Sequence, residues 1–180
     1  MAKAQKTLPH GGEAEVKAFL ERLPAQNRRE DALKLSEIMS RVTGVKPVMW
    51  GTSIVGFGTW KYAYAGGGEG IAPKIGFSPR SKRLVIYLPL WQNDLRNQLA
   101  GLGPHEASVS CLYLKSLANV DRSRLEKLLA AGFKSDVPFP GRSRSGGKPS
   151  KKKTVSKAPG KKASSKKAAR KPARKVRKKG

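Results

Sequence analysis

The sequence contains a single cysteine, Cys111, among 180 residues. One thiol cannot form an intrachain disulfide or build a cysteine-based zinc site, and this scarcity is typical of a reducing intracellular compartment. His10 and His105 are the only histidines, and two are too few for a histidine-based metal cluster. The chain also lacks the apolar core of a secretory signal and any apolar run of about 18 residues that could span a bilayer. These absences predict a cytoplasmic protein without a metal or other cofactor.

Acidic residues are absent from the last forty positions, where Lys and Arg are abundant. Residues 141–180 hold 18 of the 38 basic residues and none of the 12 acids. Apart from alanine, the only apolar side chains there are Val155 and Val176, so this segment cannot bury enough surface to offset the entropy of ordering. We predict a flexible leader at 1–12, a folded domain at 13–140 and a disordered basic tail at 141–180.

Two amphipathic helices are predicted in the first part of the domain. Apolar residues recur every three to four positions from 16 to 23, and Pro24 ends this pattern. A second pattern of the same kind runs from 28 to 43 and ends at Gly44, a residue type that favours helix C-termini. Each helix has one apolar face, which must pack against another element.

The apolar period changes to two between residues 47 and 90, where β-branched and aromatic residues dominate. This pattern predicts four consecutive strands. The turn-forming segments that separate them are residues 51–53, 66–70 and 78–82. The segment 83–88, RLVIYL, is the most apolar of these strands and is predicted to lie inside the sheet.

The remaining elements complete an α+β pattern. A short helix is predicted over 92–100 and a fifth strand over 109–114. The last helix begins at Asp121 or at a Ser-x-x-Glu capping box over 123–126, and Gly132 ends it. This order of elements predicts helices packed on one face of a mostly antiparallel sheet of about five strands.

Three ordered motifs give the domain a family resemblance. They are PVMWGTSIVGFG at 47–58, GFSPR at 76–80 and SCLYLK at 110–115. Together they resemble the YdhG-like family, a bacterial group of domains of unknown function, over residues 13–132. The resemblance implies a compact α+β fold similar to frataxin but no agreed reaction. Relatives often carry Thr-Gly-Lys before the third motif, and Ala-Ser-Val at 107–109 replaces it here, which argues against a small-anion role for that loop.

The likeness to frataxin raises iron handling, which in such folds relies on carboxylates gathered on the helical face. The two helical segments supply six acids, namely Glu13, Glu15, Glu21, Glu30, Asp31 and Glu37. Six basic residues are interleaved with them, namely Lys17, Arg22, Arg28, Arg29, Lys34 and Arg41. A hard cation would therefore meet a nearly neutral surface, and we do not assign a metal site.

The stretch VMWGTSIVGFGTW at 48–60 allows two interpretations. Trp50 and Trp60 fall on neighbouring predicted strands, and Gly56 and Gly58 leave a face without side chains that a flat ligand could approach. Alternatively, the glycines permit close packing and the indoles belong to the core. We favour packing, because the stretch contains no titratable partner.

Two further motifs are weak candidates for chemistry. GGGEG at 66–70 lacks the following helix N-terminus that a phosphate loop needs, so we predict a hairpin tip. Cys111 lies within a predicted strand without a CxxC partner, which favours a buried thiol over a nucleophile. Nothing in these motifs predicts a catalytic or cofactor-binding residue, and we expect the protein not to be an enzyme.

The tail is the strongest functional signal, because an acid-free polycation attracts nucleic acid. The predicted contacts are Lys151, Lys152, Lys153, Lys157, Lys161, Lys162, Lys166, Lys167, Arg170, Lys171, Arg174, Lys175, Arg177, Lys178 and Lys179. This Lys-Ala-Pro mixture resembles in composition the tails of linker histones. It predicts non-specific binding to DNA, or to RNA, in the bacterial nucleoid.

Two alternatives to nucleic-acid binding are open. In the first, the folded domain is an enzyme or a carrier of a small molecule or iron, and the tail only localises or solubilises it. In the second, the tail adheres to anionic lipid. The lipid alternative is weaker, because no amphipathic helix or acylation motif accompanies the basic run.

Overall fold

The computed structural model describes residues 8–64, 68–136 and 142–144, which all belong to one compact unit that ends at Gly147. Its elements are, in chain order, β1 (Pro9–His10), α1 (Glu13–Glu21), α2 (Gln26–Thr43), β2 (Val48–Trp50), β3 (Ile54–Tyr64), β4 (Glu69–Pro79), β5 (Leu84–Tyr87), α3 (Asn93–Asn97), β6 (Glu106–Ala107), β7 (Cys111–Leu114), α4 (Arg122–Lys134) and β8 (Arg142–Arg144). The predicted tail contacts lie outside these described residues.

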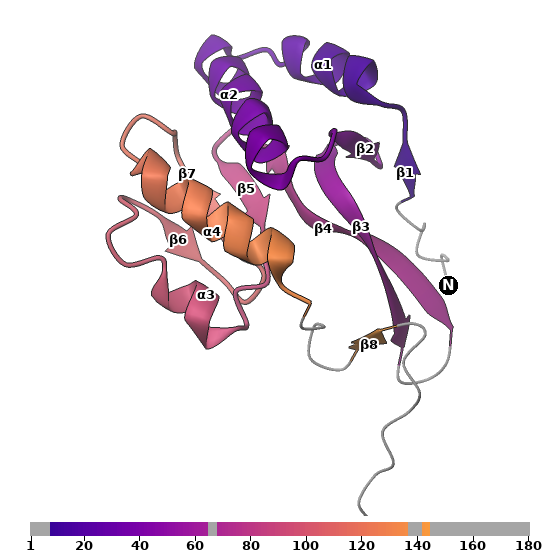
Figure 1. The fold of residues 1–180 in the computed structure, drawn as a ribbon. Helices are drawn as coiled ribbons and strands as arrows, with labels where there is room; N and C mark the ends of the chain where they lie inside the picture. The colour runs from indigo at the N-terminus through magenta and orange to yellow at the C-terminus, as the bar shows by residue number, and fades with distance from the viewer. Residues whose placement is uncertain (1–7, 65–67, 137–141, 145–180) are drawn as a thin grey trace, which may run out of the picture. The chain divides into compact units, whose positions relative to one another are not determined.

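The strands form one antiparallel sheet in the order β1-β2-β3-β4-β5-β7-β6, and β8 pairs with β3 off this path. Helices α2 and α4 lie across the same face of the sheet (Figure 1). These features confirm the predicted α+β fold with helices on one face. They also confirm that the RLVIYL segment is an interior strand, since β5 lies between β4 and β7.

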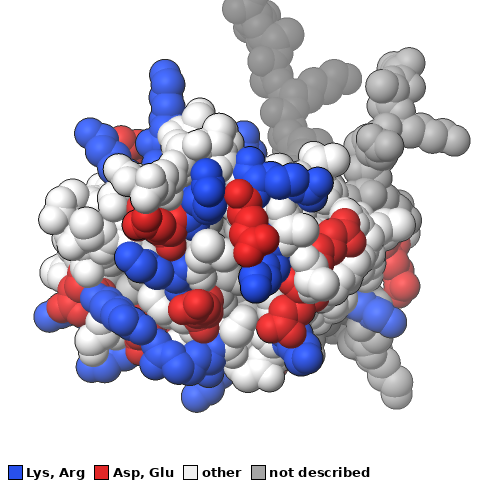
Figure 2. Space-filling model, turned by 90° about the horizontal axis from the view of Figure 1, so that it is seen from above, with Lys and Arg blue, Asp and Glu red and all other residues white. Residues whose placement is uncertain are grey.

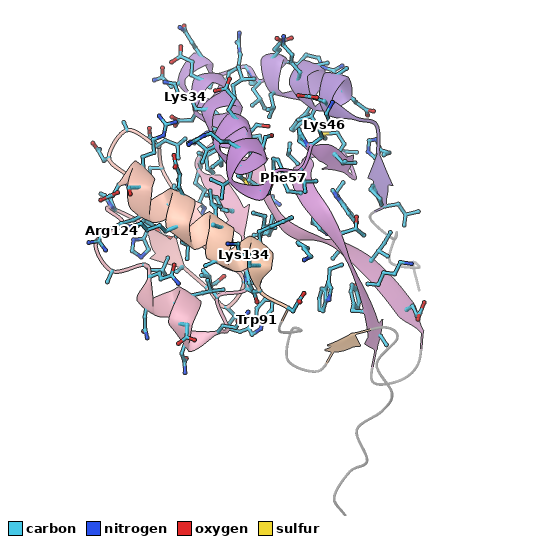
Figure 3. The ribbon with its side chains drawn as sticks, in the orientation of Figure 1. Lys34, Lys46, Phe57, Trp91, Arg124 and Lys134 are labelled. Atoms are coloured by element: carbon cyan, nitrogen blue, oxygen red, sulfur yellow. The ribbon has the colours of Figure 1, made fainter. Side chains whose placement is uncertain are left out.

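The core lies between this sheet face and the helices. The strand register aligns Val55, Phe77, Ile86 and Leu112 in one row across β3, β4, β5 and β7, and all four are fully buried. Phe57 of β3 lies close to the last turn of α2 (Figure 3). The residues of α2 and α4 that complete the core are Ala32, Leu35, Ile38, Met39, Leu125, Leu128 and Leu129.

The ends of α2 and α4 follow local backbone chemistry. Gly44 closes α2 in the left-handed conformation, with φ of 67°. The side chain of Asp121 caps α4 by accepting a hydrogen bond from the Arg124 backbone N–H at 2.9 Å. The alternative capping box over 123–126 is wrong, because Ser123 lies inside the helix. The predicted end at Gly132 is also wrong, since α4 continues to Lys134.

The sheet is larger than the five strands predicted. Strands β1, β6 and β8 span only two or three residues each, which is too short for a period-two pattern to be visible. Strand β1 falls within the predicted leader, and β8 falls within the predicted tail. The sheet therefore extends beyond both ends of the range 13–140.

Glu126 joins the two core helices at the surface. Its Oε1 accepts hydrogen bonds from Arg41 of α2 at 2.6 Å and from Arg122 of α4 at 3.0 Å. These two guanidinium groups hold the pKa of the Glu126 carboxyl below its ordinary value of 4.5. Since the folded-state pKa is lowered, the ionised carboxylate stabilises the fold at neutral pH.

We expect Glu126→Gln to lower the melting temperature at pH 7. The difference from the native chain should shrink as the pH falls through the folded-state pKa, because protonation removes the same interaction. Thermal unfolding of both chains from pH 7 to pH 3 measures this effect. Glu37→Gln is the matched control, since Glu37 is exposed on α2 and forms no ion pair with the described residues. A constant difference at every pH would contradict the assignment.

Candidate nucleic-acid interface

The start of the tail is held in the sheet. Strand β8 pairs antiparallel with the end of β3, with Arg144 opposite Tyr62 and Arg142 opposite Tyr64. Lys148 follows only four positions after β8 in the sequence. The backbone at the root of the cationic segment is therefore joined to the folded body through the long β3–β4 hairpin.

The surface over α1 and α2 carries charges of both signs. Figure 2 shows Lys and Arg side chains interspersed with Asp and Glu on the face seen from above. Three of the six acids in this region lie within 4.0 Å of a Lys or Arg nitrogen, in the pairs Lys46–Glu13, Lys17–Glu21 and Arg28–Asp31. This mixed surface attracts neither a polyanion nor a hard cation strongly. Among the described residues, no group of three or more His, Cys, Asp or Glu side chains could hold a metal ion.

One end of the sheet is different, because basic side chains gather there. Arg80, Lys82 and Arg83 lie on the turn between β4 and β5, and Lys115 directly follows β7; all four are exposed. Arg83 and Lys115 flank the register pair formed by Leu84 and Leu114, so strand pairing brings them together. We call these four residues the strand-end cluster.

A pocket of about 200 Å³ adjoins this cluster. Its lining residues are Arg83, Pro104, His105, Glu106, Tyr113, Leu114 and Lys115. The guanidinium of Arg83 lies 4.6 Å from the centre of the Tyr113 ring and 2.9 Å from Glu106 Oε2. His105 Nδ1 donates to the Gly103 carbonyl at 2.8 Å. These contacts hold the side chains of Arg83 and His105, which both line the pocket.

No local pattern in the sequence predicts this site. Arg80 belongs to the GFSPR motif, but Lys115 lies more than thirty positions further on. No continuous run of basic residues connects Arg80 with Lys115 in the sequence. Only the pairing of β5 with β7 makes them neighbours.

The glycine-spaced tryptophans form packing contacts. The Trp50 side chain is only 2% exposed and lies against Gly56, and Gly58 faces the Phe133 ring of α4. The packing interpretation is therefore confirmed for Trp50, because side chains fill the space beside both glycines. Trp60 is half-buried further along β3, with its ring 5.4 Å from that of Tyr62.

We expect Gly56→Ala to destabilise the fold. The added Cβ would lie 2.5 Å from Trp50 Nε1 and 2.7 Å from Pro73 Cβ, and overpacking of this kind typically costs about 1–3 kcal/mol. Urea denaturation measures the loss in the free energy of unfolding. In a Trp50→Phe background the same substitution should cost less, because the smaller ring leaves room for the methyl group. Equal costs in the two backgrounds would show that the indole is not the obstacle.

The GGGEG stretch and Cys111 lie in or next to regular strands of the sheet. Strands β3 and β4 pair antiparallel up to Ala63 and Glu69, so the GGGEG stretch lies where the two strands of a hairpin meet. Glu69 and Gly70 belong to β4, and Gly66 and Gly67 lie outside the described residues. Cys111 begins β7 opposite Tyr87 and is half-buried rather than fully buried. Its Sγ lies 3.8 Å from the hydroxyl of Ser110.

A cavity of about 360 Å³ between α2 and the start of α4 is large enough to hold a small molecule. Its floor is apolar, with Ile38 and Leu125, and its rim carries both carboxylates and cations. Asp31 on this rim already accepts a hydrogen bond from the Leu117 N–H at 3.3 Å and lies 4.0 Å from Arg28. A rim that carries both carboxylates and cations favours no particular class of ligand.

Comparison of the chain with family models, with curated proteins and with solved structures found no match. The resemblance to the YdhG-like family therefore stays a prediction. None of the described helices combines the length and the apolar character required to traverse a bilayer. The fold and the charges define an α+β body with helices on one face of an antiparallel sheet, continued in sequence by an acid-free cationic segment.

Proposed function

We propose that the protein is a non-enzymatic, nucleoid-associated protein that binds DNA through its C-terminal cations, with RNA as the alternative polymer. The observation that carries this proposal is the presence of 18 basic residues and no acid in positions 141–180. Such a density exceeds what solubility requires and produces a field that attracts polyanions.

Binding follows from counterion release. Each phosphate neutralised by Lys or Arg frees condensed cations, so affinity falls steeply as salt rises, with a slope of about 0.9 per contact on duplex DNA. The segment contains no aromatic residue that could stack on bases. Its sequence also carries no pattern typical of a recognition helix for the major groove. We therefore expect little dependence on DNA sequence.

The charges on the folded body agree with binding mainly through the C-terminal cations. Its helical surface carries interleaved charges of both signs (Figure 2), so it adds little attraction for a polyanion there. Strand β8, which holds the first two cations of positions 141–180, pairs with β3, so the cationic segment begins in the sheet. The alternative, a carrier of iron or a small molecule, gains no support from a surface on which carboxylates are paired with cations.

The experiment that tests the proposal compares duplex binding by the native chain and by a full-length variant. The variant replaces the fifteen predicted contacts between Lys151 and Lys179 with glutamine, and it leaves β8 and the whole body unchanged. Fluorescence anisotropy across a salt series measures both affinities. Equal affinities at low salt would contradict the proposal.

A further inference from the structure

The strand-end cluster concentrates uncompensated charge on the body. Arg80, Lys82 and Lys115 form no ion pair with the residues that the structure describes, and Arg83 pairs only with Glu106. Within the described part of the chain, Glu106 is thus the only acid that touches this group. Some cations elsewhere on the body, such as Lys17, Lys46 and Arg122, have carboxylate partners, whereas others, such as Lys34, form no ion pair with the described residues.

We propose that the strand-end cluster and the adjoining pocket bind a phosphodiester group of a nucleic-acid strand. This inference rests on the proposed function and gives the body a direct part in it. The ligand is identified by its charge: a phosphate oxygen accepts hydrogen bonds from guanidinium and ammonium groups, and contacts of this kind position a protein on the backbone without reading sequence.

The pocket is arranged for one phosphate. The guanidinium of Arg83 lies over the Tyr113 ring, a contact that does not compete with a phosphate, so the group loses little conformational entropy when it binds. Lys115 approaches from the end of the neighbouring strand, and the His105 ring lies on the same wall. Three nitrogen-bearing side chains therefore line a space of about 200 Å³ that is open to solvent.

A substitution at Glu106 tests the proposal, because this residue is the carboxylate partner of Arg83. Its carboxylate competes with a phosphate for Arg83, since Oε2 lies 2.9 Å from the guanidinium nitrogen. Removing its charge by Glu106→Gln should free Arg83 and tighten binding by up to about fivefold, the range expected when an exposed ion pair no longer competes with the phosphate. Because removing any acid raises the attraction for a polyanion, the gain supports the site only where it exceeds that of Glu37→Gln, which removes the same charge from α2.

The test uses the full-length chain with its fifteen tail cations replaced by glutamine, so that only the body can bind. A single-stranded thymidine tetranucleotide is the probe, and NMR shifts of the Arg83, His105 and Lys115 side chains report binding. We expect all three signals to shift saturably in the chain with the neutral tail. In Arg83→Gln/Lys115→Gln the remaining His105 signal should no longer shift, and in Glu106→Gln the shifts should saturate at a lower concentration of the probe. Lys34→Gln is the matched control, because Lys34 is exposed and unpaired among the described residues and lies on α2 (Figure 3).

The native chain supplies the second measurement. Arg83→Gln/Lys115→Gln should lower the salt slope of binding to a longer single strand by about 0.7, because the one phosphate in the pocket is no longer neutralised, whereas Lys34→Gln should leave it unchanged. An unchanged slope together with absent NMR shifts would overturn the inference. So would inorganic phosphate shifting the same signals as strongly as the tetranucleotide, because the site would then be a general anion site. Failure of the tail proposal looks different, since the tail variant would then bind like the native chain.

Discussion

Replacing the fifteen tail cations with glutamine is expected to lower affinity for duplex DNA by about 1,000-fold or more at 50 mM salt. If six to ten of these cations contact phosphates at once, the native chain loses about 10³- to 10⁵-fold in affinity between 50 and 200 mM salt. The variant lacks these cations, so its affinity should be weak and nearly independent of salt. Fluorescence anisotropy with one labelled duplex measures both curves.

A shuffled tail is the matched control for this prediction. It keeps the composition of residues 148–180 but changes their order. Because counterion release depends on the number of phosphates neutralised, the shuffled chain should bind within about threefold of the native chain and with the same salt slope. Loss of binding on shuffling would point to a specific motif in the tail and would contradict a purely electrostatic mechanism.

Trp50→Ala is expected to cost about 3–5 kcal/mol in the free energy of unfolding, the usual range when a buried tryptophan is truncated. The side chain of Trp50 is 2% exposed and fills the space beside Gly56. Truncation leaves a cavity there, because glycine has no side chain that could move into it. Urea denaturation monitored by circular dichroism measures the loss.

Trp60→Ala is the matched control, since it makes the same chemical change on the neighbouring strand. Trp60 is only half-buried, so its truncation should cost roughly half as much or less. Equal costs would show that the two indoles are packed alike. If Trp50→Phe weakened nucleic-acid binding while leaving stability intact, Trp50 would instead be part of a binding surface.

Periodicity predicted the regular elements because the pattern is local. The residues of α2 repeat at helical spacing, and Gly44 ends the helix as its left-handed conformation requires. The period of two predicted strands between residues 47 and 90, and along β3 it leaves Val55 and Phe57 on one side of the strand, where both are fully buried. The short strands β1 and β8 were not predicted, since two or three residues carry no period and their pairing depends on distant partners.

Whether the glycines formed a ligand floor could not be decided from residues 48–60 alone. The side chains that occupy the space beside Gly56 and Gly58 come from Trp50 on β2 and from Phe133 on α4. Phe133 lies more than seventy positions away in the sequence, so no local pattern relates it to Gly58. Only the packing of α4 on β3 shows that a side chain, and not a ligand, occupies the space beside Gly58.

The charge of the tail is a property of the sequence by itself. Eighteen cations without one acid in positions 141–180 produce a polycation in any conformation, because adjacent residues cannot separate beyond the length of the chain between them. The strand-end cluster, in contrast, was decided by tertiary structure. Arg83 and Lys115 meet only because the register of β5 and β7 aligns Leu84 with Leu114, and strand register is set by burial of one sheet face against the helices.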